Sequence, residues 1–265
     1  MKSLRYFLAV SALGLASAVA QISISSLNQT YTQDFNSMGN TTATYPAGWA
    51  GWKASGSCAT MSNGTIVTDA TTPKFTVNNG TGNTGTIYNY GSTGSDDRAL
   101  GSVASSTFIG AFGASFINET GQMLTSNHVS MGFIAEQWRT GSSATDNETW
   151  VFSYKIGGNL TDLTGWTALS TFDLKEILTG SASAGAVDGN DPANRLALIP
   201  TAFSGLNWAD NSTLHIRWAD ADSTSNDAGM AIDDFQFKVI PEPGTWIMIG
   251  LGTAFLLWRR KRLFS

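Results

Sequence analysis

Apolar and polar residues alternate at a period of two in several short segments of the chain. In residues 150–156, Trp150, Phe152, Tyr154 and Ile156 occupy every second position, and residues 214–218 repeat the pattern. Successive side chains of a β-strand point to opposite faces, so this alternation predicts half-buried strands. The same reasoning predicts strands at residues 30–35, 64–68, 86–90, 106–112, 129–133, 166–172 and 235–239.

Clusters of Gly, Asn, Ser and Asp separate these segments, as at residues 78–80, 91–94 and 188–192. Such clusters favour tight turns. About nine short strands joined by turns predict an all-β fold, an antiparallel β-sandwich of jelly-roll type. One short helix is predicted at residues 173–178. We find no internal repeat and no sign of a second domain, so we interpret residues 21–240 as one ectodomain.

The N-terminal residues show the three parts of a secretory signal peptide. Lys2 and Arg5 form a charged region, residues 6–15 are apolar, and residues 18–20 (Ala-Val-Ala) give a small-x-small cleavage site. This order predicts a signal peptide at residues 1–20, its removal by signal peptidase, and export of the body.

The C-terminal residues form a second targeting segment. Residues 245–258 are mostly apolar, with Trp246 and Trp258 at the two ends. As a helix they would extend about 21 Å, which is short of the ~30 Å hydrocarbon core. Indole rings favour the membrane boundary and cations stay in the cytoplasm, so we predict a single transmembrane helix. The cytoplasmic basic stop consists of Arg259, Arg260, Lys261 and Arg262. A buried core helix is the alternative, although such a helix rarely ends in four consecutive cations.

Pro241, Glu242 and Pro243 precede this segment, and the two prolines favour an extended, accessible peptide. The motif at 241–244, the helix at 245–258 and the stop at 259–262 together resemble the PEP-CTERM sorting signal of bacterial envelope proteins. The resemblance implies that an exosortase, a transpeptidase-like membrane enzyme, recognises the motif and processes the tail at 241–265. It implies a transient tether to the inner membrane, and then the cell surface or the extracellular space.

The two terminal segments hide how acidic the body is. Residues 21–244 hold nine Lys and Arg and all twenty Asp and Glu, a net charge of −11 against −5 for the whole chain. Such a surface repels phosphate backbones, which argues against nucleic acid as a partner. Cys58 is the only cysteine, so no intramolecular disulfide can form.

Oxygen-bearing side chains are densest near the end of the body. Asp220, Asp222, Asn226 and Asp227 carry carboxylate and amide oxygens, and Ca²⁺ takes six to eight oxygen ligands. The spacing does not match an EF-hand loop. Our hypothesis is a structural calcium site, and the alternative is that these residues cap turns and solvate a loop. No other cofactor is predicted.

Residues 229–235 resemble the last strand of MAM-like and lectin-like jelly rolls in secreted bacterial modules. In such a strand Asp233 or Asp234 faces inward. Because a buried carboxylate needs a partner, we expect an ion pair with Arg139 or Arg98.

Trp49 and Trp52 lie beside glycines in a segment that we interpret as irregular. Exposed indole faces stack on flat apolar surfaces, so these two are the candidate carbohydrate-stacking residues. Glu136 would serve a glycosidase only with a second carboxylate at a defined distance. The chain has no nucleophile elbow, no zinc-protease helix and no phosphate loop. We therefore predict that it is not an enzyme.

These observations favour an exported cell-envelope or extracellular-matrix protein with a structural or adhesive role in exopolysaccharide or biofilm. Extracellular polysaccharide is then its expected partner. A lectin-like carbohydrate-binding module is the alternative, and a glycan hydrolase is a further one.

Overall fold

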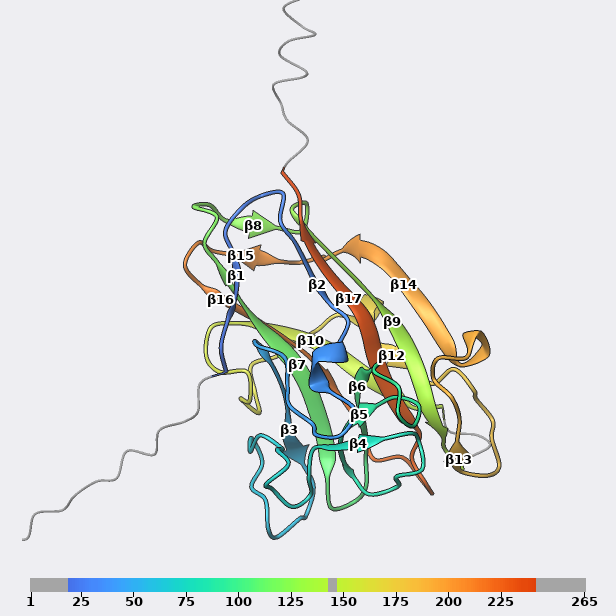
Figure 1. The fold of residues 1–265 in the computed structure, drawn as a ribbon. Coiled ribbons are helices and arrows are strands. Elements are labelled where there is room, and N and C mark those ends of the chain that lie inside the picture. The colour runs from blue at the N-terminus through green and yellow to red at the C-terminus, as the bar shows by residue number, and fades with distance from the viewer. Residues whose placement is uncertain (1–18, 143–146, 242–265) are drawn as a thin grey trace, which may run out of the picture.

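The computed structural model describes residues 19–142 and 147–241. Two β-sheets pack face to face in an all-β sandwich, as the alternation predicts (Figure 1). Within these residues, no helix has the length and apolar character needed to span a membrane. The predicted transmembrane helix, the basic stop and nearly all of the signal peptide lie outside the described residues.

The first sheet, sheet A, is centred on three long strands that are adjacent in the order β7, β16, β10. Short strands extend it on both sides. Its members are β1 (Ile22–Ile24), β3 (Trp49–Ser55), β7 (Ile109–Asn118), β10 (Thr149–Ile156), β11 (Thr167–Ala168), β12 (Leu174–Lys175) and β16 (Thr213–Ala219).

The second sheet, sheet B, has β17 at its centre, between β9 on one side and β6 and β2 on the other. Its members are β2 (Thr30–Gln33), β4 (Thr76–Asn78), β5 (Thr86–Tyr90), β6 (Ala99–Val103), β9 (Val129–Thr140), β13 (Gly185–Ala186), β14 (Arg195–Ala202) and β17 (Gly229–Val239). The remaining elements are the pair β8 (Leu124–Thr125) and β15 (Asn207–Trp208), and the 3-10 helices η1 (Asn36–Met38), η2 (Ser170–Phe172) and η3 (Pro192–Asn194). Most strand pairs are antiparallel, but β1 with β7 and β4 with β5 are parallel.

The core lies between the sheets and is rich in aromatic rings. Trp218 of sheet A is buried at its centre, with ring centroids 5.2 Å from Phe152 and 5.2 Å from Phe133 of sheet B. Because side chains alternate along a strand, the residues between these core positions face outward. Each sheet therefore has an outer face of its own.

Several sequence predictions of local structure are wrong. Residues 166–172, predicted as one strand, contain the two-residue strand β11 and the 3-10 helix η2. Residues 64–68 contribute one isolated bridge, Trp52 to Ile66, in place of a strand. Residues 173–178 contain β12 in place of a helix, because Asp173 does not act as a helix cap. Its Oδ1 accepts a hydrogen bond from the backbone N–H of Phe152 in β10, 2.9 Å away, which holds the segment against the edge of sheet A.

Candidate functional site

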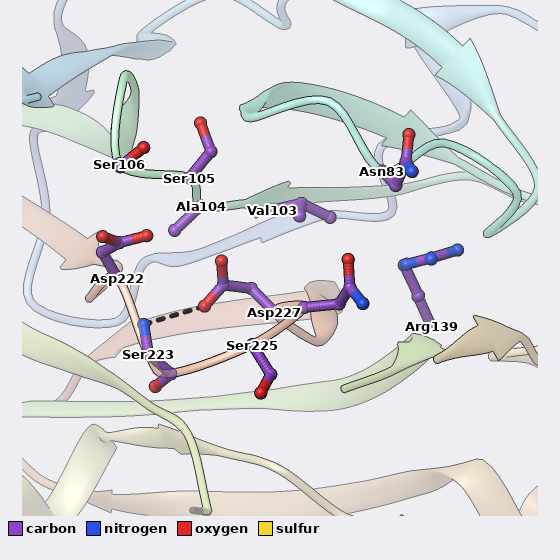
Figure 2. Close-up of a pocket in the computed structure, with 11 residues that line it drawn as sticks. Asn83, Val103, Ala104, Ser105, Ser106, Arg139, Asp222, Ser223, Ser225 and Asp227 are labelled. Atoms are coloured by element: carbon purple, nitrogen blue, oxygen red, sulfur yellow. Dashed lines mark hydrogen bonds between the residues drawn. The ribbon is translucent and has the colours of Figure 1, made fainter. Parts of the chain in front are cut away.

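A pocket of about 320 Å³ opens at one end of sheet B (Figure 2). Val103 lies at the end of β6, and Arg139 lies near the end of β9. Residues 104–106 form one side of the pocket, and the loop between β16 and β17 forms the other. Of the eleven lining residues, nine are polar or charged. The pocket therefore offers hydrogen-bond donors and acceptors in a small space.

Hydrogen bonds hold the loop between β16 and β17 in place. Asp227 Oδ1 accepts a hydrogen bond from the backbone N–H of Ser223 at 2.8 Å. Ser142 Oγ, just beyond β9, accepts from the backbone N–H and the side-chain amide of Asn226 at 3.0 and 3.2 Å. The loop is thus tied both to itself and to the end of β9.

A β-bulge brings Arg139 to the outer face of sheet B. Met230 lies opposite Gln137 and Gly229 opposite Arg139, which leaves Trp138 as the extra residue. A Cβ atom at Gly229 would lie 2.6 Å from the Tyr90 hydroxyl and 3.0 Å from the Cβ of Arg139. Arg139 and Tyr90 therefore stand side by side at the pocket.

Three buried rings form an aromatic layer on this outer face. Tyr90 stacks on Trp138, with centroids 5.9 Å apart and planes at 6°, and Tyr88 lies 5.2 Å from Tyr90. The layer also contains Ala99, Val103 and Ala231. Burial raises the pKa of Tyr90 well above its ordinary value. Val103 belongs both to this layer and to the pocket lining, and the faces of the three rings are covered.

Two buried carboxyl groups share the same outer face. Glu136 is 1 % exposed and accepts a hydrogen bond from Trp138 Nε1 at 3.0 Å, and Asp233 is 5 % exposed. Burial, together with nearby carboxylates, raises the pKa of Glu136 to about 7 and that of Asp233 to about 8. Neither Glu136 Oε1 nor Asp233 Oδ1 finds a hydrogen-bond partner among the described residues.

The expected ion pair of Asp233 with Arg98 or Arg139 is not formed, and this prediction is corrected. The Arg98 Nε–H donates to Asn89 Oδ1 at 2.7 Å, and Arg139 Nη1 donates to the carbonyl of Gly80 at 3.4 Å. Asp234 is exposed, with a left-handed φ of 46° at the centre of the β17 bulge. Strand alternation does not predict these partners, because Asn89 lies in β5 and the Gly80 carbonyl lies 59 positions from Arg139.

Three of the four residues of the calcium hypothesis, Asp222, Asn226 and Asp227, line the pocket. Asp220 is buried instead, where it accepts hydrogen bonds from Ser102 Oγ at 2.9 Å and the N–H of Ala221 at 2.8 Å. Within residues 19–142 and 147–241, no three His, Cys, Asp or Glu side chains are arranged to hold a metal ion. Calcium binding stays a prediction.

Trp49 lies in the main core and Trp52 in a separate buried cluster with Ala111 and Leu160, and their assignment as stacking platforms is corrected. They lie in the regular strand β3, and they are 2 % and 0 % exposed. Trp49 packs 4.9 Å from Phe35 and donates from Nε1 to the Tyr31 hydroxyl at 2.9 Å. Stacking on a sugar requires an open ring face, which neither indole has. By contrast, Tyr88 and Tyr90 of the aromatic layer on sheet B occupy alternate positions in residues 86–90, where the sequence predicts a strand.

The chain leaves the sandwich directly from its central strand. β17 ends at Val239, and the N–H of Ile240 still donates to the carbonyl of His128 at 2.8 Å. Pro241 is the last described residue, and it is exposed. The rest of the predicted motif, Glu242 and Pro243, and the basic stop at 259–262 lie outside the described residues.

Comparison with known proteins identifies this tail. Residues 239–262 match the PEP-CTERM protein-sorting motif, which confirms the resemblance found in the sequence. The chain therefore carries a C-terminal signal that implies export. No curated protein matches the chain.

Solved structures similar to the chain include three bacterial modules. The CBM22-1 xylan-binding domain of Paenibacillus barcinonensis Xyn10C is 9 % identical, with a TM-score of 0.37, over 82 % of this chain and 98 % of that domain. The C-terminal family 22 carbohydrate-binding module of Clostridium thermocellum Xyn10B is 8 % identical (TM-score 0.32; 59 % and 81 % covered). The family 11 module from Clostridium thermocellum is 10 % identical (TM-score 0.26; 60 % and 84 % covered). At these scores, no conclusion about a ligand follows.

Proposed function

We propose that this chain is an exported protein with a structural or adhesive role in an extracellular polysaccharide matrix. The observation that carries the proposal is the sorting motif at residues 239–262, which begins at the last residue of β17. The sorting signal follows the folded body without a linker. This arrangement suits a protein in which the β-sandwich itself is the part that is delivered. An exosortase is its processing partner, and signal peptidase acts on the other end.

The tail suits a temporary tether. Its apolar residues 245–258 are about 21 Å long as a helix, so they span the bilayer less fully than a permanent anchor of about 20 residues. Pro241 is exposed at the end of the sandwich, where an enzyme in the membrane can reach the motif. In the proposed sequence the body is exported, held at the inner membrane, and then moved to the surface.

The pocket on sheet B favours non-catalytic polysaccharide binding as the way in which the body adheres. Its lining combines the cation Arg139, the amide side chains Asn83 and Asn226, and the carboxylate Asp222 with serine hydroxyls. Sugar hydroxyl groups both donate and accept hydrogen bonds, which such a mixed lining can satisfy. This is the second candidate function, and it is compatible with the first.

The sorting step is tested by replacing Pro241 and Pro243 with alanine in a host that has an exosortase. The wild-type body is expected at the cell surface or in the medium, and the variant is expected to stay in the inner-membrane fraction. An exosortase-deficient host is the control and should reproduce the variant. Wild-type sorting of the variant, or of the protein in that host, would refute exosortase processing.

A further inference from the structure

We infer that the pocket beside Arg139 takes an uncharged, hydroxyl-rich sugar residue and discriminates against glycans that carry carboxylates. The inference rests on the proposed adhesion to polysaccharide and deepens it by naming the ligand class.

Acidic groups surround the pocket on the side of the loop between β16 and β17. Asp222 and Asp227 line it, and Glu148 is buried nearby. Glu148 Oε1 accepts a hydrogen bond from the N–H of Ala228 at 2.9 Å, so its position is fixed beside the loop. An incoming carboxylate would meet this local field and also the net charge of −11 on residues 21–244.

Arg139 lies across the pocket from Asp222 and is 8 % exposed (Figure 2). Its guanidinium is a cation with five N–H donors. The Arg139 Nη1 group donates to the Gly80 carbonyl at 3.4 Å, which leaves most of the five N–H groups of the side chain for other acceptors. A carboxylate beside this guanidinium would still lie in the field of Asp222 and Asp227, whereas an uncharged hydroxyl group meets no such repulsion.

The hydroxyl groups of one sugar suit both ends of the pocket. One can accept a hydrogen bond from Arg139 and another can donate to the carboxylate of Asp222, with Asn83 serving either role (Figure 2). The volume of about 320 Å³ lies at the small end of the roughly 300–1,000 Å³ typical of ligand sites. The pocket therefore fits a terminal or branching sugar better than a long stretch of chain.

The test is binding of the full-length chain, in detergent, to a panel of neutral and uronate-containing glycans. We expect the tight binders to be neutral. If acidic glycans bind as tightly as neutral ones, the inference fails and the matrix role stands. If no glycan binds, both the inference and the adhesive role fail, while the sorting experiment above remains independent of this result.

Two variants connect the binding to this pocket. Arg139→Gln should weaken binding of the best neutral glycan about tenfold, the effect of losing a hydrogen bond to a charged donor. Arg195→Gln, an exposed arginine on the same sheet, is the matched control and should bind as the wild type does. Asp222→Asn, in the exposed loop, should improve binding of uronate glycans relative to neutral ones. Unchanged affinity in a folded Arg139→Gln protein, or an unchanged preference in Asp222→Asn, would overturn the inference.

Discussion

The outer faces of the two sheets differ in how fully their buried polar groups are paired. On sheet A, Ser115, His215 and Lys155 lie side by side across β7, β16 and β10. Ser115 Oγ and His215 Nδ1 share a hydrogen bond of 2.8 Å, and His215 Nε2 lies 3.2 Å from the carbonyl of Gly158. The buried side chains of this polar row are thus satisfied by the fold.

On sheet B, four buried atoms have no hydrogen-bond partner among the described residues. They are the Tyr90 hydroxyl, Glu136 Oε1, Arg139 Nε and Asp233 Oδ1. An unpaired buried polar group costs about 1–3 kcal/mol, so such groups are uncommon without a reason. Of the four residues, Arg139 lines the pocket and the Tyr90 hydroxyl lies beside it, whereas Glu136 and Asp233 are not part of the lining.

The faces are also covered differently. Residues 157–166 fold back over sheet A, where Leu160 packs with Trp52 and Ala111. Trp166 in the same segment lies under the guanidinium of Arg217, 4.2 Å from its ring centroid. Sheet A is closed by a loop of its own, whereas the pocket leaves one end of sheet B open.

The largest expected effect is on the aromatic layer of sheet B. Trp138→Ala removes a fully buried ring stacked on Tyr90 and also the donor to Glu136. We expect a loss of about 3–5 kcal/mol in unfolding free energy, measured by denaturant titration. Trp138→Phe keeps most of the apolar area, so it should cost clearly less. Equal losses for the two variants would show that the ring contributes little and the hydrogen bond most.

The second prediction is a pH dependence of opposite sign for the two faces. The pKa of Glu136 is raised to about 7 and that of Asp233 to about 8, so the folded state binds protons that the unfolded state has released. Stability from this pair is therefore full below about pH 4 and is lost as the pH rises towards 8. Burial lowers the pKa of His215, so its contribution is full above pH 6.5 and falls at lower pH.

Glu136→Gln combined with Asp233→Asn should flatten the decline in stability between pH 4 and 8. At pH 8 the double variant should be more stable than the wild type by on the order of 2 kcal/mol. The exposed Asp69→Asn is the control and should leave the profile unchanged. Thermal unfolding across this pH range measures both, and a wild-type slope in the double variant would exclude the two carboxyls as its source.

The third prediction concerns the loop that covers sheet A. Gly157 and Gly158 have φ values of 72° and 76°, so alanine at either costs roughly 1–2 kcal/mol from backbone strain. A Cβ at Gly158 would lie 2.5 Å from Asp162 Oδ2, whereas one at Gly157 meets nothing within 4 Å. Gly158→Ala should therefore destabilise the protein more than Gly157→Ala in urea unfolding. Equal effects would show that the Asp162 side chain moves aside at little energetic cost.

The smallest effect is expected for the ion pair between Lys155 and Asp162 in the same loop. Hydrogen bonds from the N–H of Asn159 and from Lys155 lower the pKa of Asp162. Both side chains are partly exposed, so Lys155→Met should cost no more than about 1 kcal/mol. The loss should shrink further at high salt. A larger, salt-independent loss would mean that Lys155 matters through packing.

Much of the fold was predictable because strand alternation is local. The strand predicted at residues 86–90 is β5 with the same limits, and residues 150–156 lie within β10. Glycine neighbours suggested an irregular segment at Trp49 and Trp52, but pairing of β3 with β7 overrides that local signal. Position along the chain does not reveal such long-range pairing.

The candidate site was predictable only in part. Asp222, Asn226 and Asp227 were singled out by their density of oxygen atoms, and they do line the pocket. Arg139 was missed as a pocket residue because its direction depends on a bulge between β9 and β17. One inserted residue changes which face a side chain occupies, and a single sequence does not show where that insertion falls.

The position of β17 has a mechanical consequence. A pull on the tail enters the body along this strand, which β9 borders on one side and β6 and β2 on the other (Figure 1). A force along β17 loads the hydrogen bonds to its neighbouring strands all at once. These hydrogen bonds therefore cannot break one after another, as they do when an edge strand is pulled away from a sheet. A sandwich held by its middle strand is suited to drag and shear while it is still attached to the cell.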